Sequence, residues 1–138
     1  MEKIKNIWFS DGRIFLLTDE GKVYSRPLET FPVLKDADDV DRNNYEIGSF
    51  GDDVRWPKLD EDIHISSFYE TAEPDYDNEI ARIFKQFPQL NVSEVARVIG
   101  INKSLLAKYI YGMRKPSEKR ASQIKEALHQ LGQQLQTV

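Results

Sequence analysis

Residues 91–116 read NVSEVARVIGINKSLLAKYIYGMRKP, and this stretch predicts two short helices joined by a sharp turn. Apolar residues recur at helical spacing on both sides of Gly100. Glycine adopts the left-handed backbone conformation at little cost, so we expect a positive φ at this position. Asn91 and Asn102 are N-cap residues placed where the first and the second helix should begin. The pattern is typical of a helix-turn-helix.

The second predicted helix would offer polar side chains to a DNA groove. Its inward face is supplied by Leu106 and Tyr109. That assignment leaves Lys103, Ser104 and Lys108 for the outward side. Recognition helices present residues of their first turns to base edges in the major groove. The sequence therefore predicts double-stranded DNA as the ligand of this segment.

The same segment resembles the phage-repressor-like helix-turn-helix domains of the Xre/Cro type. The residues that carry the resemblance are Gly100, Ile101, Asn102, Lys103, Ser104, Leu106, Tyr109, Gly112, Arg114, Lys115 and Pro116. It implies a lambda-repressor-like, all-α domain in which Lys103, Ser104 and Lys108 face bases. It also implies phosphate contacts from Asn102 and Lys115. The predicted DNA-binding set is Asn102, Lys103, Ser104, Lys108, Arg114 and Lys115, with Gly100 as the structural turn.

Charge is divided unevenly along the chain. Residues 1–75 hold nine Lys or Arg against eighteen Asp or Glu, whereas residues 76–138 hold ten against five. Eight basic residues and a single acid fall between Arg97 and Lys125. Phosphate binding requires such a local positive field, even in a chain whose formal net charge is −4. A solvated helix face would explain the charge by itself, but not its coincidence with the helix-turn-helix spacing.

The first half of the chain has a β pattern instead. Three β-prone runs, predicted to form a meander through two hairpin turns, are residues 4–9, 13–18 and 22–27. Residues 28–45 suit one or two short helices or a structured loop. Further strands are predicted at residues 45–50 and 62–68. The expected fold class is α+β, with a small N-terminal domain of β-meander and short helices followed by the all-α domain.

The N-terminal half also resembles a known family. The stretches DGRIFLLTDEG, PLETFPVL and NNYEIGSFGDDVRWPKLDEDI are similar to a bacterial domain of unknown function, numbered 2442. The resemblance covers about residues 3–68, and its most recognisable part runs from Trp56 to Ile63. Some members are encoded beside a second small protein in arrangements suggestive of toxin–antitoxin pairs. The resemblance therefore implies an antitoxin-like repressor.

Composition predicts the domain boundaries. Residues 1–68 form the N-terminal domain, residues 69–76 are a polar and acidic linker, and residues 77–138 form the helix-turn-helix domain. The last predicted helix carries an apolar stripe at three- and four-residue spacing: Ala121, Ile124, Leu128, Leu131, Leu135 and Val138. Its first part would close the domain core. Its last part predicts a homodimer contact, unless the stripe folds back on its own chain.

Other constellations favour structural roles over catalysis. The carboxylates Asp36, Asp38, Asp39 and Asp41 lack the glycine and the bidentate glutamate of a calcium loop. The acids at Asp60, Glu61 and Asp62 beside His64 are expected to be solvated or bound to turn amides. We expect His64 and His129 to be exposed. No metal site is predicted.

Several classes of protein are excluded. The chain has no cysteine, and it shows no nucleophile triad, phosphate-binding glycine loop or dinucleotide fingerprint. We therefore expect no enzyme activity and no cofactor. No apolar run is long enough to span a bilayer, and no signal peptide is recognisable, which predicts a cytoplasmic protein without a membrane partner.

Three functions remain open after the sequence is considered. The first is a bacterial transcriptional repressor that binds operator DNA as a homodimer. The second is an antitoxin whose N-terminal domain neutralises a partner protein, a toxin, while the helix-turn-helix autoregulates. The third is an enzyme built on the acidic N-terminal half, with the helical domain serving only oligomerisation. Co-purification would separate the first two, and stabilisation by a divalent metal would favour the third.

Overall fold

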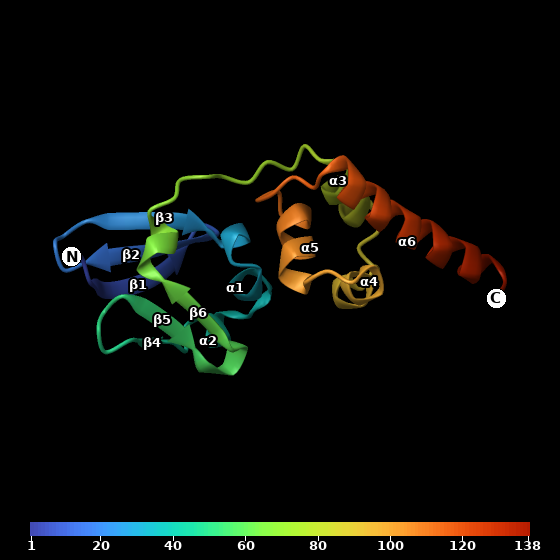
Figure 1. Cartoon of the computed structure of the whole chain (residues 1–138). Coiled ribbons are helices and arrows are strands. Elements are labelled where there is room, and N and C mark those ends of the chain that lie inside the picture. The colour runs from blue at the N-terminus through green and yellow to red at the C-terminus, as the bar shows by residue number, and fades with distance from the viewer. The chain divides into compact units, whose positions relative to one another are not determined.

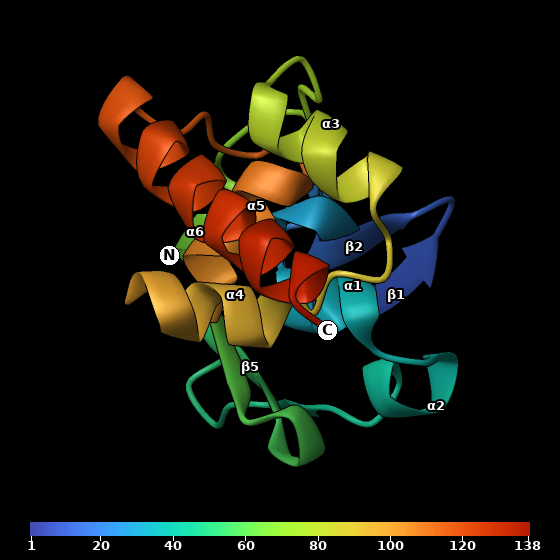
Figure 2. The same ribbon diagram turned by 90° about the vertical axis from the view of Figure 1, so that its right-hand side faces the viewer.

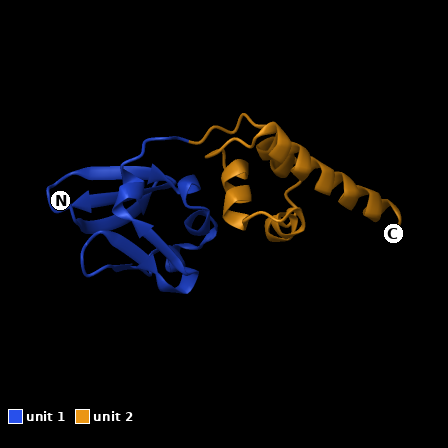
Figure 3. Cartoon of the chain, viewed as in Figure 1, with its two compact units in different colours: residues 1–73 blue, residues 74–138 orange.

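In the computed structural model, which describes residues 1–138, the chain separates into residues 1–73, called unit 1, and residues 74–138, called unit 2 (Figure 3). The structure is mixed α+β, with two three-stranded antiparallel sheets and six α-helices (Figure 1). Unit 1 contains β1 (Ile4–Ser10), β2 (Arg13–Thr18), β3 (Val23–Pro27), α1 (Pro32–Asp36), α2 (Asp39–Arg42), β4 (Glu46–Ile47), β5 (Asp53–Trp56) and β6 (Glu61–His64), together with 3-10 turns at Leu28–Thr30, Pro57–Leu59 and Ile65–Phe68. Unit 2 contains α3 (Glu79–Gln86), α4 (Val92–Ile99), α5 (Lys103–Ile110) and α6 (Glu118–Gln136).

The first sheet is the predicted meander, in the order β1-β2-β3. Asp11 and Gly12 connect β1 to β2 with φ values of 52° and 73°, the two positive values that a tight hairpin turn needs. Pairing places Ile14 and Leu16 on the face that enters the core. The alternate residues point the other way, where Trp8 and Phe15 stack with ring centroids 5.5 Å apart.

The second sheet differs from the prediction. The strand expected at residues 45–50 is reduced to β4, because the chain turns at Gly48–Asp52 and returns as β5, where no strand was predicted. The strand expected at residues 62–68 ends as β6 at His64, and a 3-10 turn follows. A four-residue strand such as β5 carries little periodicity. Its alternation becomes clear only once Val54 and Trp56 are seen to be buried.

Both sheets of unit 1 contribute to one hydrophobic core. Its buried members are Ile4, Ile7, Ile14, Leu16, Leu28, Leu34, Val54, Trp56, Ile63, Ile65 and Phe68. Arg26 lies among them on β3 with only 1% of its surface exposed. Its Nη2 atom donates to Thr30 at 3.3 Å, whereas its Nε and Nη1 atoms have no hydrogen-bond partner. A buried guanidinium with two unbonded nitrogens costs stability.

Four helices make up unit 2. In it, α5 packs against α3 and α4, while α6 packs against α4 and α3 (Figure 2). The buried side chains of this second core are Ile80, Phe84, Val95, Ala96, Leu106, Tyr109 and Ile124. Only the first part of α6 takes part in the core, and its C-terminal end extends past the other helices of the unit (Figure 1).

The segment predicted as a linker is bound at both of its ends. Tyr69 packs edge-on against Tyr24, and both carboxylate oxygens of Glu73 accept hydrogen bonds from Arg13. These contacts lie within unit 1. In unit 2 the backbone N–H of Asp75 donates to the carbonyl of Gly112 at 2.7 Å. The segment lacks helix and strand, but its ends are held by specific contacts.

Candidate nucleic-acid interface

The turn between α4 and α5 is formed by a short set of backbone hydrogen bonds. Gly100 follows α4 with φ of 83°, in the left-handed region. Its N–H donates to the carbonyl of Arg97 at 3.2 Å, and the N–H of Ile101 donates to that of Ala96 at 3.0 Å. This is the Schellman arrangement that commonly ends a helix at glycine. Only three residues therefore separate the end of α4 from the start of α5.

Asparagine side chains cap the N-termini of both helices. The side-chain oxygen of Asn91 accepts from the N–H of Glu94 at 3.1 Å, and that of Asn102 accepts from the N–H of Ser104 at 2.7 Å. The carboxylate of Glu94 binds Arg97 rather than the backbone of Asn91, so only one half of a capping box is formed. The first turn of α5 contains no acidic residue. Its helix N-terminus therefore stays attractive to phosphate.

A second glycine ends α5 in the same way. Gly112 has φ of 76°, and the N–H of Met113 donates to the carbonyl of Lys108 at 2.9 Å. A Cβ atom on Gly112 would lie 2.7 Å from the backbone of Asp75. The side chain of Asn78 also binds this end of the helix, because its Nδ2 donates to the carbonyl of Tyr109 at 3.1 Å. Residues 75–78 are thus built onto the end of α5.

The predicted DNA-binding residues lie in one continuous part of unit 2. Asn102, Lys103 and Ser104 are exposed at the start of α5, and Lys108 is half-buried one turn further on. Arg114 and Lys115 are exposed in the loop that follows the helix. The inward positions are occupied by Leu106, Ala107 and Tyr109. One helix and its following loop therefore carry all six residues.

Most of the nearby basic side chains have no acidic partner. Arg97 pairs with Glu94, Lys115 with Asp75 and Lys125 with Glu79. The other five basic residues between positions 97 and 125, which form no ion pair, are Lys103, Lys108, Arg114, Lys119 and Arg120. Unpaired cations at a helix start and in the adjacent loop are available to neutralise phosphate.

The ion pair at Lys115 involves the segment that precedes α3. The Nζ atom of Lys115 lies 3.3 Å from a carboxylate oxygen of Asp75. The other oxygen of Asp75 accepts from the backbone N–H of Asp77 at 3.0 Å. That backbone hydrogen bond, followed by the Lys115 ammonium, lowers the pKa of Asp75. The carboxylate therefore stays ionised beside a predicted phosphate-binding side chain.

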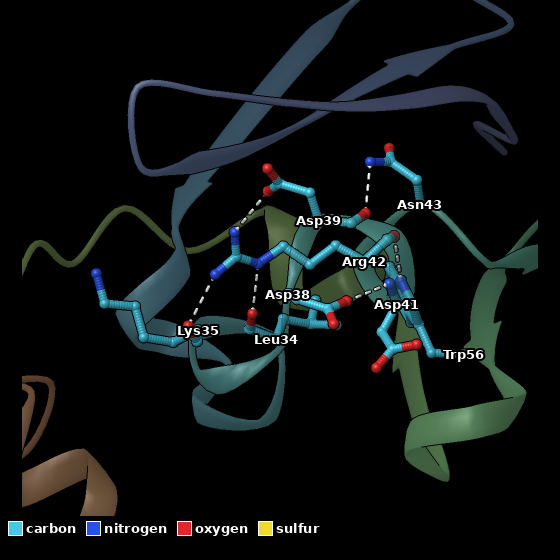
Figure 4. A network of polar contacts seen from close by, with 8 residues as sticks. All are labelled: Leu34, Lys35, Asp38, Asp39, Asp41, Arg42, Asn43 and Trp56. Carbon is cyan, nitrogen blue, oxygen red and sulfur yellow. Dashed lines mark hydrogen bonds and ion pairs between the residues drawn. The ribbon is translucent and has the colours of Figure 1, made fainter.

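The acidic cluster of unit 1 has a structural role (Figure 4). The Asp38 side chain caps α2 by accepting from the N–H of Asp41 at 2.8 Å. Arg42 binds Asp39 and also donates to the carbonyls of Leu34 and Lys35. The ring nitrogen of the core residue Trp56 donates to the carbonyl of Arg42, and this hydrogen bond connects α2 to the core. Asp38 and Asp39 thus support α2, and Arg42 joins α2 to α1.

The second acidic stretch also stabilises local structure. Arg55 bridges Asp60 and Asp62, and the hydrogen bond to Asp60 is the main cause that raises the pKa of Arg55. His64 is exposed and caps the 3-10 turn, accepting from the N–H of Ser66 at 3.1 Å. No group of three or more His, Asp or Glu side chains in residues 1–138 is arranged to hold a metal ion.

Two open grooves run along the exposed end of α6. A groove of about 460 Å³ lies between the α3 side, including Ile83, Phe87 and Leu90, and the α6 side, including Leu131 and Leu135. A smaller groove of about 220 Å³ lies toward α4, and Val98 lines it. Leu131 is 37% exposed and Leu135 is 62% exposed. The stripe on α6 therefore continues as surface after it leaves the core.

Sequence reasoning missed two features of this interface. It assigned Asp75 to a linker, and it gave Gly112 no partner. The contact between them joins positions 37 residues apart, counted from 75 to 112. No local pattern signals such a pairing. The glycine at position 112 was a clue, because glycine allows a positive φ. A glycine alone does not indicate which distant segment packs against it.

Comparison with known proteins identifies the N-terminal half. The family model described as "Protein of unknown function (DUF2442)" matches residues 4–74. The chain belongs to this family. The predicted resemblance to it is thereby confirmed, and the match extends past Glu73, which binds Arg13. No curated protein and no solved structure matches the chain significantly. None of the helices combines the length and apolarity that crossing a lipid bilayer requires.

Proposed function

We propose that the chain is a DNA-binding transcriptional regulator of the helix-turn-helix class, acting as a repressor, with α5 as its recognition helix. The observation that carries the proposal is the arrangement of α4, the Gly100 turn and α5, with exposed and unpaired cations at the start of α5 and in the loop after it. Lys103 and Ser104 are the proposed base-reading residues, supported by Lys108. Asn102, Arg114 and Lys115 are the proposed phosphate contacts.

A homodimer is the expected binding form. One recognition helix reads about half a site, and two-fold pairing places two such helices about one DNA turn apart. The exposed end of α6 supplies apolar surface from Leu131 and Leu135, and the groove beside it is lined by Phe87 and Leu90. A helix end next to an apolar groove on the same chain suits a self-complementary interface. We propose that this end of α6 forms the dimer contact.

Binding to double-stranded DNA at several salt concentrations tests the proposal. With roughly four to six phosphates neutralised per dimer, the logarithm of affinity should fall against the logarithm of salt with a slope of about −4 to −5. Lys103→Ala should relax sequence preference, whereas Arg114→Ala should weaken binding about equally on all sequences. A slope near zero, or a chain that binds no DNA at low salt, would refute the function.

A second candidate function has one observation in its favour. Trp8 and Phe15 stack on the face of the first sheet that points away from the core, beside the half-buried Leu17. None of the three belongs to the core of unit 1. Such an aromatic surface suits a partner protein, as an antitoxin would need. Trp8→Arg should then abolish co-purification of a partner from the native host, while Val40→Arg, on the exposed side of α2, should not.

A further inference from the structure

The residue that pairs with Lys115 lies in a segment with an unusual position in the chain. Asp75 belongs to unit 2 and holds Lys115 at 3.3 Å, while its own backbone N–H binds Gly112 at 2.7 Å. Glu73 belongs to unit 1 and is held by Arg13 through both carboxylate oxygens. Only Pro74 separates the two acids. We call residues 73–75 the acidic strap.

Asp75 would compete with DNA phosphate for the Lys115 ammonium. Its carboxylate forms an ion pair with the Lys115 ammonium. Both side chains remain solvent-exposed, Asp75 at 57% and Lys115 at 61%. A phosphate that approaches Lys115 would meet this carboxylate and would have to displace it. An exposed ion pair is weak enough to be displaced. Such a competition would adjust DNA affinity without abolishing it.

The position of Asp75 is fixed by more than its charge. The Asp75 backbone lies so close to Gly112 that a Cβ atom at position 112 would clash with it. Asn78 adds a buried hydrogen bond to the carbonyl of Tyr109. These contacts hold the carboxylate at the end of α5 even when Lys115 moves. The position of Asp75 beside Lys115 thus depends on the backbone, because only glycine at position 112 allows the Asp75 backbone to come this close.

We propose that the acidic strap is an autoinhibitory element that masks Lys115 from DNA phosphate. This inference rests on the proposed function and assigns a regulation to the same site. The strap is anchored in unit 1 by the Arg13–Glu73 pair, which Ser25 supports by accepting from Arg13 at 3.1 Å. The fixed φ of Pro74 keeps the two anchored acids close together.

Asp75→Asn in the full chain is the decisive variant. Asparagine keeps the acceptor for the Asp77 N–H but loses the charge that holds Lys115. DNA affinity at low salt should rise between about threefold and tenfold. The salt slope should steepen by up to about 0.9 per chain, because the Lys115 ammonium can then neutralise a phosphate without first leaving Asp75. The matched control is Asp77→Asn, which removes the same charge from a carboxylate that pairs with Arg82 instead.

Lys115→Ala completes the test as a double-mutant cycle. It should cost less in the wild-type chain than in the Asp75→Asn chain, where it should remove the whole gain. A gain that persists without Lys115, or an Asp75→Asn chain that behaves as Asp77→Asn does, overturns the inference while leaving DNA binding intact. A wild-type chain that binds no DNA overturns the proposed function and this inference together.

A readout without DNA tests the mask itself. Acetylation of Lys115 by a small reagent, measured by mass spectrometry, should be faster in the Asp75→Asn chain, with Lys119 as the internal reference. Equal rates would show that Asp75 does not protect Lys115 and would overturn the inference.

Discussion

Two glycines in unit 2 provide a matched pair of substitutions. Gly100 and Gly112 each end a helix with φ near 80°, at 83° and 76°. An alanine at either position pays the cost of a left-handed backbone, about 1–2 kcal/mol. At Gly100 the added Cβ would meet no atom within 4 Å, whereas at Gly112 it would lie 2.7 Å from the carbonyl carbon and oxygen of Asp75. Only the second change adds a steric conflict.

The contact between a Cβ at position 112 and the Asp75 backbone determines how much more Gly112→Ala should destabilise the unit than Gly100→Ala. Relief of the conflict would require the Asp75 backbone to move by several tenths of an ångström, which would weaken its 2.7 Å hydrogen bond to Gly112. Overpacking of this kind typically costs about 1–3 kcal/mol. Gly112→Ala should therefore destabilise the helical unit by about 1–3 kcal/mol more than Gly100→Ala does. For a unit of this length the midpoint of thermal unfolding should be lower by at least about 4 °C.

Far-ultraviolet circular dichroism of the full chain is a suitable assay, because the long helices all belong to unit 2. Thermal and urea unfolding of the wild type, Gly100→Ala and Gly112→Ala would be compared under one set of conditions. Equal destabilisation by the two alanines would refute the close approach of Asp75 to the end of α5. Greater destabilisation by Gly100→Ala would refute it more strongly.

Three further predictions concern other parts of the chain. Leu131→Asp combined with Leu135→Asp should convert a dimer into a monomer in sedimentation and weaken DNA binding, without unfolding the helices, while Gln133→Asp should change neither. Arg26→Met should leave the stability to urea unchanged or raise it, because two buried nitrogens of this guanidinium have no partner; a clear loss of stability would contradict the reasoning. The hydrogen bond from Arg13 lowers the pKa of Glu73, so this pair stabilises the fold at neutral pH and the contribution is lost as the pH falls through that lowered pKa. A Glu73→Gln chain should show less acid-induced loss of stability than the wild type.

Local signals in the sequence were sufficient for the helix ends and the turn of the candidate interface. The capping roles of Asn91 and Asn102 and the positive φ of Gly100 each depend on atoms within a few residues, so they are legible in a short stretch. The meander was predictable for the same reason, because its first hairpin turn is set by Asp11 and Gly12. The DNA-binding roles of the exposed side chains remain predictions.

Contacts between distant residues were not predictable. The short strand β5 is defined by the burial of Val54 and Trp56, which depends on the rest of unit 1. The pairing of Arg13 with Glu73 spans 60 positions, and no periodicity or turn chemistry connects them. The partner of Gly112 was hidden in the same way. Strand pairing and ion pairs at long range depend on tertiary packing, which overrides local preference.

The placement of the aromatic residues gives the chain two separate optical reporters. Both tryptophans belong to unit 1, Trp56 fully buried and Trp8 stacked on Phe15 at the outward face. Indole fluorescence therefore follows unit 1 alone, and the helical dichroism follows mainly unit 2. Unfolding curves from the two signals will coincide only if the units melt cooperatively. A ligand seated on the first sheet would shift the emission of Trp8 and leave that of Trp56 unchanged. A Trp8→Phe chain, which retains only the emission of Trp56, should therefore show no shift.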